Sequence, residues 1–330
     1  MQIKFPLLSV CIITYNHENF IAQAIESVLM QKTNFDFEII IGEDCSADKT
    51  REICQTFKNN YPEKIKLLLN DENIGMMPNF IRALKACTDK YIALLEGDDF
   101  WTDPDKLQKQ VDFLEANPGY AICFHNSNLL YEDDPLKKSL FIQHKIKSTF
   151  SLKDILKGNF IPTQSCVFRN NLIKDYPEWF YHALPGDWFL HIFNAHFGLI
   201  KYSDEVMSTY RIHAGGVYSG EPKISNFEKT IASLNAYYYD IDIRYRGIIK
   251  RNISRRYFSI GKLLLKENHR KEALNKTLTS LKIYPLNILF VPFHYLKFFG
   301  LLLLPGNLSV RRKGQRFSGQ DNINKRMEPS

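Results

Sequence analysis

Carboxylates are crowded at the end of one apolar run of this sequence. Residues 92–95 are typical of a buried strand, and Glu96, Asp98 and Asp99 follow them directly in the stretch YIALLEGDDFWTDPDK. Like charges at this spacing repel one another, so the arrangement costs stability unless a cation or a positive ligand compensates. Oxygen ligands suit hard cations such as Mg²⁺ and Mn²⁺, which keep coordination sites open for phosphate. The stretch therefore predicts a divalent-cation site.

Helix capping is the alternative explanation for part of this acidic group. Asp103 precedes a proline at a predicted helix start, and Asp99 lies close enough to act in the same way. Capping leaves Glu96 and Asp98 unexplained, because nothing else in the segment offsets their repulsion.

The elements that position these acids form a repeating pattern. Apolar runs at 7–14, 37–42, 65–70 and 91–96 are followed by helical patterns at 19–31, 48–61, 78–87 and 104–116. This α/β alternation predicts an open, mostly parallel sheet with helices on both faces. Ligands bind at the carboxyl ends of such strands, so the polar residues after each strand are the candidates for function.

Composition narrows the class of protein. With 330 residues and 45% hydrophobic content, the chain can form one large core and a second, smaller unit. Its six cysteines form no C-x-x-C pair, which indicates reduced core residues and a cytosolic protein. The apolar stretch 5–13 lacks a cleavage site of small residues, and we interpret it as a first strand rather than a signal peptide.

Charge divides the chain into two unlike parts. Residues 1–243 hold 24 Lys and Arg against 32 Asp and Glu, whereas residues 244–330 hold 19 against 4. The basic part contains the apolar stretch NILFVPFHYLKFFGLLLLP (287–305), which fits an anionic membrane surface better than nucleic acid. Internal charges and prolines favour a helix that lies in the interface over one that spans it. The basic residues that follow this stretch are Arg311, Arg312, Lys313 and Arg316.

Six motifs occur in the order, and at roughly the separations, found in one enzyme family. They are SVCIITYNHENFIAQAIESVLMQ, EIIIGEDCSADKT, NIGMMPNF, KYIALLEGDDFW, GDW and YRIH. From 7 to 218, about two thirds of its length, the chain resembles the family 2 glycosyltransferases. The resemblance implies a GT-A fold, a Rossmann-like and mostly parallel sheet flanked by helices. We expect this domain at 1–225, a helical connector resembling a tetratricopeptide hairpin at 226–284, and a membrane-associating tail at 285–330.

The resemblance implies a role for the acidic stretch. Residues 96–99 match the D-x-D element, with Glu96 at the position where aspartate is more common. Asp98 would be the principal ligand of Mn²⁺ or Mg²⁺, with Asp99 and His213 completing the shell and Glu96 touching the ribose or the metal. The cation would neutralise the charge that develops on the diphosphate leaving group.

Donor binding is implied for residues at the other strand ends. The matched positions for the nucleotide-sugar are Thr14, Tyr15, Asn16, Glu18, Glu43, Asp44, Asn73 and Arg211. Asp44 matches the acid that reads a uracil-type base edge, which favours a UDP-sugar. Capping of the next helix is the alternative for Asp44, and a turn is the alternative for Asn16 and Asn73. The arginine that many members place after the NIGMMPNF glycine is missing, and the nearest one is Arg82.

Asp187 in LPGDWFLHI matches the catalytic base, with Gly186 replacing the usual glutamate. An inverting transfer needs one carboxylate to take the proton of the acceptor hydroxyl. The alternative is a plain acid at a helix N-terminus.

Rival functions are less well supported. No glycine lies in TYNHENF after the first strand, which excludes a G-x-G-x-x-G dinucleotide site and the glycine-rich loop of a sugar nucleotidyltransferase. A processive synthase would carry several transmembrane helices and a Q-x-x-R-W segment. The prediction is therefore a non-processive enzyme that adds sugars to a glycan or lipid-linked glycan of the bacterial surface, in the cytoplasm and peripherally attached to the inner face of the membrane. A catalytically degenerate scaffold of a glycan assembly complex is the alternative.

Overall fold

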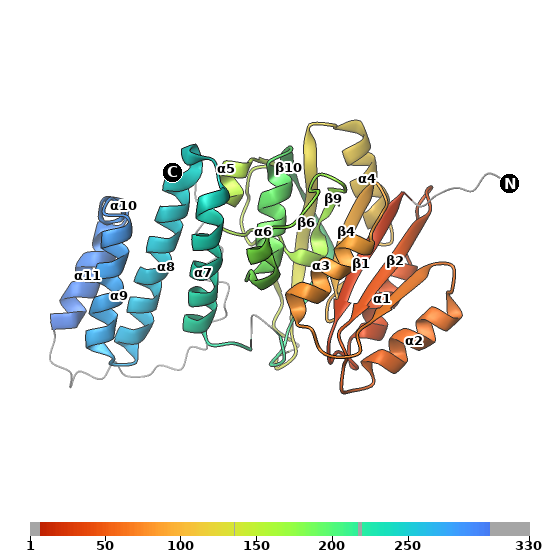
Figure 1. Ribbon diagram of the computed structural model, residues 1–330, viewed down its shortest axis with the longest axis horizontal. Helices are drawn as coiled ribbons and strands as arrows, with labels where there is room; N and C mark the ends of the chain where they lie inside the picture. The colour runs from red at the N-terminus through yellow and green to blue at the C-terminus, as the bar shows by residue number, and fades with distance from the viewer. Residues whose placement is uncertain (1–6, 135, 217–219, 304–330) are drawn as a thin grey trace.

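The computed structural model describes residues 7–134, 136–216 and 220–303. Figure 1 shows an elongated molecule, with a twisted sheet and its helices at one end and a row of long helices at the other. Among the described residues, no helix is both long and apolar enough to cross a membrane.

The first four long strands lie side by side and run parallel. They are β1 (Leu8–Thr14), β2 (Phe37–Glu43), β3 (Ile65–Leu69) and β4 (Tyr91–Glu96). The sheet continues in the order β3-β2-β1-β4-β9-β6-β10-β5. Its remaining strands are β5 (Phe100–Trp101), β6 (Tyr120–Tyr131), β9 (Val167–Arg169) and β10 (Leu199–Ile212), with β7 (Ser139–Leu140) and β8 (Thr149–Phe150) beside β6 and β10. Because β9 is antiparallel to its neighbours and β10 is parallel to β6, the sheet is mixed but mostly parallel, as predicted.

Side chains of the central strands alternate between two hydrophobic cores. In β1, Val10 and Ile12 enter one core and Cys11 enters the other, as the two-residue period of a strand requires. The first core is covered by α1 (Ile21–Leu29), α2 (Thr50–Asn60) and α4 (Lys106–Ala116), and the second by α3 (Met76–Ala86) and α6 (Gly186–Ala195). The helices predicted at 48–61, 78–87 and 104–116 are thus present, with ends within two residues of those expected.

Shorter elements join the sheet to the helical end of the molecule. These are α5 (Leu152–Ile155) and the 3₁₀ helices η1 (Thr163–Ser165), η2 (Glu178–His182) and η3 (Ile243–Tyr245). The long helices are α7 (Lys223–Asp240), α8 (Arg246–Lys266) and α9 (Arg270–Ile283), followed by α10 (Asn287–Phe290) and α11 (Pro292–Leu303).

The helical end packs directly on the sheet. Ile249 and Ile253 of α8 belong to the same hydrophobic core as Trp188 of α6. The Asn252 side chain donates a 2.9 Å hydrogen bond to the carbonyl of Leu156. A continuous core therefore connects the long helices with one face of the sheet.

The outermost helices, α10 and α11, expose an unusual number of large apolar side chains. We call this the α10–α11 surface, and it comprises Leu286, Ile288, Leu289, Phe290, Phe293, Leu296, Leu301 and Leu303. Phe293 is 81% exposed, while Tyr295 and Phe298 of the same helix are buried against the rest of the protein. One side of α11 thus faces the core and the other faces solvent. The basic residues 311–316 lie outside the described residues.

Candidate functional site

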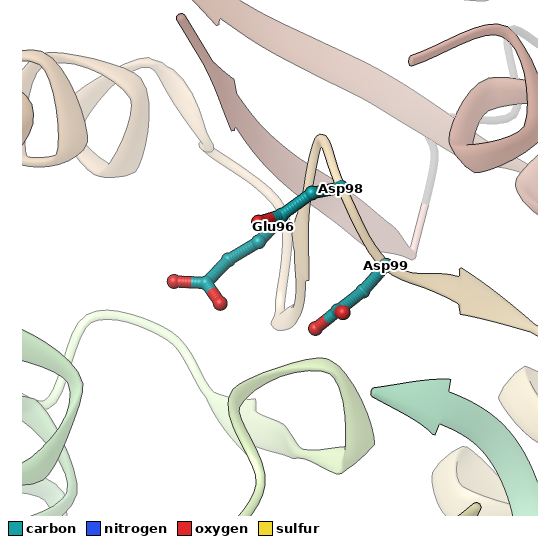
Figure 2. A group of neighbouring side chains, drawn as sticks. All are labelled: Glu96, Asp98 and Asp99. Atoms are coloured by element: carbon teal, nitrogen blue, oxygen red, sulfur yellow. The ribbon is translucent and has the colours of Figure 1, made fainter. Parts of the chain in front are cut away.

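Three carboxylates meet where β4 ends. Figure 2 shows Glu96, Asp98 and Asp99 on one tight turn, which we call the acidic cluster. One oxygen of each lies within 4.8 Å of the others. A Cβ atom on Gly97 would lie 2.6 Å from the Thr14 hydroxyl and 2.9 Å from His17 Nδ1. Only glycine therefore lets this turn lie so close to the end of β1.

Asp99 is the most buried member of the acidic cluster, with 1% of its surface exposed. Its Oδ1 accepts a 2.8 Å hydrogen bond from the backbone N–H of Arg211, but its Oδ2 is buried without a partner. Burial, followed by the charges of Asp98 and Glu96, raises the pKa of Asp99 well above its ordinary value. Asp99 thus binds the end of β10 instead of capping a helix.

The carboxylate of Glu96 accepts no hydrogen bond from the described residues. Figure 2 shows its carboxylate on the same side of the turn as that of Asp99. Burial and the neighbouring charges of Asp98 and Asp187 raise its pKa well above the usual range. The part of the chain that the structure describes therefore offers no donor or positive charge that compensates Glu96.

Two histidines face Asp98. The Nε2 atom of His213 lies 3.0 Å from Asp98 Oδ2, and the Nε2 atom of His17 lies 3.9 Å from the same oxygen. Burial alone would raise the pKa of Asp98, but the hydrogen bond from His213 and the charges of both histidines hold it below its ordinary value. Burial lowers the pKa of His17.

Arg211 holds the turn of the acidic cluster from β10. Its guanidinium donates to the carbonyl of Asp98 at 2.8 Å, to Glu132 at 2.5 Å and to Gln23 at 2.6 Å. The same group lies 4.7 Å from the centre of the Phe20 ring. Three protein acceptors and an aromatic face thus hold Arg211, and phosphate binding by this residue stays a prediction.

A second group of acids follows β2. Asp44 is buried, and its carboxylate accepts hydrogen bonds from the Asn70 side chain and from the backbone N–H groups of Ile74 and Gly75, at 2.8–2.9 Å. Glu43 is also buried and accepts from Arg51 and the Ser46 backbone, both at 2.6 Å. These carboxylates tie together the loops after β2 and β3.

Asn73 in the loop after β3 and Arg82 in α3 both form hydrogen bonds with this loop. The Asn73 side chain accepts from the backbone of Gly75 at 3.1 Å, which is the turn expected as its alternative role. Arg82 donates to the Asn70 side chain and to the carbonyl of Leu69. Both residues therefore support this loop.

The loop after β1 is interlocked with the loop after β2. Asn16, at a φ of +55°, accepts from the backbone of Ala47 at 2.9 Å, and Glu18 accepts from the backbone of Lys49 at 3.1 Å. Tyr15 stays 44% exposed beside them. Thr14 is buried, with its hydroxyl 3.3 Å from His17 Nδ1. An aromatic face is thus presented to solvent at the strand edge.

Asp187 is the second residue of α6, and its charge acts on Glu96 of the acidic cluster. Its Oδ2 accepts from Asn159 at 2.8 Å and from Thr163 at 3.2 Å. Burial raises its pKa, although these hydrogen bonds act in the opposite direction. A Cβ atom on the preceding Gly186 would lie 2.1 Å from Met77 Sδ, so a glutamate at that position would force Met77 to move.

The donor set of the acidic cluster fits a divalent cation. Three carboxylates converge, and the Asp99 Oδ2 atom is buried without a hydrogen bond. A cation would satisfy that oxygen and relieve the repulsion that raises the pKa of Glu96 and Asp99. His213 lies next to this set through its contact with Asp98.

The sequence analysis missed several residues of the site. They are His17, Gln23, Glu132, Asn159 and Thr163, which contact Asp98, Arg211 or Asp187. Only His17 carried a signal, because it directly follows Asn16 at a strand end. The others come from helices, turns and a loop whose distance from the site along the chain conceals their proximity.

The amino-acid sequence is similar to those of several bacterial proteins. An uncharacterized protein of Mycobacterium tuberculosis is 38% identical over 211 residues, which cover 64% of this chain and 60% of that protein. TuaG of Bacillus subtilis, provisionally named a teichuronic acid biosynthesis glycosyltransferase, is 33% identical over 154 residues, which cover 46% of this chain and 60% of TuaG. The matches thus span about 60% of the length of these relatives.

Solved structures establish the fold. Residues 1–349 of TarS from S. aureus in complex with UDP-GlcNAc match with a TM-score of 0.54 and 16% identity, covering 84% of this chain and 91% of that one. The mannosyltransferase PcManGT from Pyrobaculum calidifontis, in complex with GDP-Man and Mn²⁺, matches with a TM-score of 0.55 and 13% identity, covering 90% and 85%. The arrangement is the GT-A fold with a helical region at its C-terminal side.

The family model for Glycosyl transferase family 2 matches residues 9–176, which is half of the chain and includes the acidic cluster. With the strand order and the strand-end residues as described, this match identifies the chain as a member of glycosyltransferase family 2.

Proposed function

We propose that the chain is an inverting, metal-dependent and non-processive glycosyltransferase that moves a sugar from a UDP-sugar to a hydroxyl of a growing surface glycan. The observation that carries this proposal is the acidic cluster, where three carboxylates converge and, among the described residues, neither the Glu96 carboxylate nor Asp99 Oδ2 has a hydrogen-bond donor. UDP-GlcNAc in the TarS complex and teichuronic acid in the name of TuaG support the donor and the setting.

In this proposal the acidic cluster holds the cation, and the loops after β1 and β2 hold the base of the donor. A divalent cation bound in the acidic cluster would stabilise the negative charge that develops on the diphosphate. Asp98 and Asp99 would hold the cation, with Glu96 facing the ribose or the metal. The donor base would lie against the exposed ring of Tyr15, near the loops after β1 and β2.

Asp187 acts as the base. The acceptor oxygen attacks the anomeric carbon, its proton passes to a carboxylate oxygen of Asp187, and the electrons of the breaking C–O bond pass to the diphosphate. Configuration inverts because the attack comes from the face opposite the leaving group. The raised pKa of Asp187 makes it a stronger base than an exposed aspartate, and Asn159 and Thr163 hold its orientation.

Release of free nucleotide tests this function. A panel of nucleotide-sugars is incubated with the full chain and acceptor glycans, with Mn²⁺ or with chelator. The proposal expects metal-dependent release of UDP from a UDP-sugar in the presence of a hydroxyl acceptor. A folded protein that binds donors but releases no nucleotide from any of them would instead be a scaffold.

We also propose that the α10–α11 surface rests on the anionic inner face of the cell membrane. Eight large apolar side chains are exposed within residues 286–303, and Lys297 lies among them. The sequence continues with four basic residues at 311–316. Apolar side chains that insert among lipid head groups, flanked by cations, are the features of an interfacial helix.

Vesicle sedimentation tests this attachment. The full chain should bind vesicles that contain anionic lipid more than vesicles of neutral lipid, and high salt should weaken the binding. Phe293→Ser should reduce binding, whereas Phe197→Ser, which removes a 58% exposed ring elsewhere, should not. If Phe293→Ser and Phe197→Ser bind anionic vesicles equally well, the assignment of the α10–α11 surface to the membrane is wrong. If the surface instead forms a dimer, the molecular mass of the protein in solution will rise with protein concentration.

A further inference from the structure

The 3₁₀ helix η1 (Thr163–Ser165) contacts two helices, α4 and α6, that belong to different hydrophobic cores. At its first residue, the Thr163 hydroxyl donates to Oδ2 of Asp187 at the start of α6, at 3.2 Å. At its last residue, the backbone carbonyl of Ser165 accepts a 2.9 Å hydrogen bond from the side chain of Gln110 in α4. A three-residue segment thus connects the Gln110 amide with the proposed base.

The carbonyl groups of η1 depend on donors from outside it. A 3₁₀ helix this short makes few hydrogen bonds of its own, and a buried carbonyl group without a donor costs free energy. Gln164 and Ser165 are both fully buried. The indole Nε1–H of Trp101 donates to the carbonyl of Gln164 at 2.8 Å, and the Gln110 amide donates to the carbonyl of Ser165. Two buried side chains, from β5 and α4, therefore fix the backbone of η1.

The Gln110 amide is itself held in one orientation. Its Nε2 group donates to the carbonyls of Ser165 and Cys123, at 2.9 and 3.0 Å. Its Oε1 atom accepts a 2.8 Å hydrogen bond from the amine of Lys106, one helical turn earlier in α4. A flipped amide would place its oxygen against two carbonyl oxygens, which offer no donor. The buried amine of Lys106 thus helps to keep the N–H groups of Gln110 directed at η1.

We propose that Gln110 is a positioning residue for the reaction, because it holds η1 in the place from which Thr163 orients the carboxylate of Asp187. This inference rests on the role of base proposed for Asp187 above. A displacement of about 1 Å at a catalytic group can lower the rate about 100-fold. Asn159 donates to the same oxygen of Asp187 at 2.8 Å, so loss of the Thr163 contact should remove part of the orientation and leave the rest.

A double-mutant cycle, measured with the UDP-sugar and glycan acceptor that the nucleotide-release panel identifies, tests the proposal. Thr163→Val keeps the shape of the side chain but removes its hydroxyl, and Gln110→Met removes both N–H donors. We expect kcat to fall about tenfold in Thr163→Val and about fivefold in Gln110→Met, with the KM for the donor within about twofold. The double variant should lose about tenfold, because both changes remove the same contact, whereas independent effects would multiply to about fiftyfold.

The titration of Asp187 gives a readout that a merely structural role would not change. Burial raises the pKa of Asp187, and the hydrogen bonds from Asn159 and Thr163 oppose that rise. Loss of the Thr163 contact should raise the pKa further, so the acid limb of the kcat profile should move to higher pH in Thr163→Val. Gln110→Met should move it in the same direction. Carboxyl ¹³C NMR of labelled aspartate follows the same change without turnover, with the Asp187 signal assigned from its absence in Asp187→Asn.

Matched variants separate this role from a general loss of stability. Gln31→Met changes another buried glutamine, whose amide hydrogen-bonds the backbone elsewhere and does not reach η1 within the described residues. It should leave kcat and the titration of Asp187 unchanged. Trp101→Phe keeps an aromatic ring but removes the donor to Gln164, and it should change kcat and the titration in the same direction as Gln110→Met. It provides a second test if Gln110→Met does not fold.

Three results would overturn the inference. Gln110→Met could keep the wild-type kcat, its effect could multiply with that of Thr163→Val, or it could lower kcat without moving the titration of Asp187. In each case Gln110 does not act through η1, and the role of Asp187 stands. If Asp187→Asn instead retains the wild-type kcat, or no donor in the panel is turned over, the proposed function itself fails.

Discussion

Acids follow both β2 and β4, the two strands on either side of β1, but the protein treats them differently. After β2, the carboxylates of Glu43 and Asp44 accept hydrogen bonds from a guanidinium, a side-chain amide and three backbone N–H groups. After β4, the carboxylate of Glu96 accepts no hydrogen bond from the described residues, and Asp99 Oδ2 is buried without a partner among them.

This difference separates carboxylates that the described residues supply with donors from carboxylates that they do not. Buried carboxylates with enough donors stabilise the loops that they connect. Burial, followed by the charges of neighbouring acids, raises the pKa values of Glu96 and Asp99. A cation would relieve the unfavourable electrostatics of the acidic cluster. The order in which the acids occur in the sequence does not reveal this distinction.

The largest effect is expected at Asp187, which faces the acidic cluster without belonging to it. Asp187→Asn keeps the shape of the side chain but removes the base, so kcat should fall about 10²–10⁴-fold while the KM for the donor stays within about threefold. Asp175→Asn, at an exposed site, is the control. Steady-state kinetics with a saturating acceptor checks this, and a kcat near wild type would remove Asp187 from the mechanism.

Stability should respond most strongly at Asp44. Asp44→Ala leaves three N–H donors without their acceptor in a buried setting, so the free energy of unfolding should fall by about 3 kcal/mol. Asp71→Ala, on the exposed part of the next loop, should change it by less than about 0.5 kcal/mol. Urea denaturation measures both, and a similar small change in each would mean that Asp44 does not stabilise these loops.

Glu96 should behave in the opposite way. Without metal, Glu96→Gln removes a poorly compensated charge, so stability at neutral pH should rise by about 1 kcal/mol. With Mn²⁺ present, the variant should gain less stability than the wild type does. Thermal melts with chelator and with Mn²⁺ distinguish the two conditions, and destabilisation under chelator would mean that the protein already compensates this charge.

Lys106 extends the comparison to a buried amine, which donates to Gln110 at 2.8 Å and forms no ion pair with the described residues. It is fully buried above the Trp101 ring, and burial lowers its pKa to about 7. From about pH 7 to pH 10 the unfolded chain therefore holds a proton that the folded chain has lost, so this group makes stability rise with pH. Relative to Lys106→Met, the wild type should gain about 1 kcal/mol between pH 7 and pH 8. Urea denaturation at each pH measures this difference. If the free energy of unfolding changes with pH by the same amount in the wild type and in Lys106→Met, the prediction is wrong.

The sequence by itself determined the four parallel strands β1 to β4, the helices that follow them and the place of the acids. Apolar periodicity is local, so 92–95 could be identified as a buried strand and Glu96, Asp98 and Asp99 as its polar end. The alternation of strands and helices then predicted a parallel sheet, in which these residues lie at the edge where ligands bind. The motifs added Asp187 and His213, which the fold brings to the same edge.

Only the tertiary structure decided which polar groups meet. The donors around Asp44, the clamp of Arg211 on the turn of the acidic cluster and the approach of His17 to Asp98 all join segments far apart in the chain. Periodicity reports which face of an element is buried. The partners that lie across from it depend on strand order and crossovers, because side chains pack within a few ångströms in space regardless of their separation in sequence.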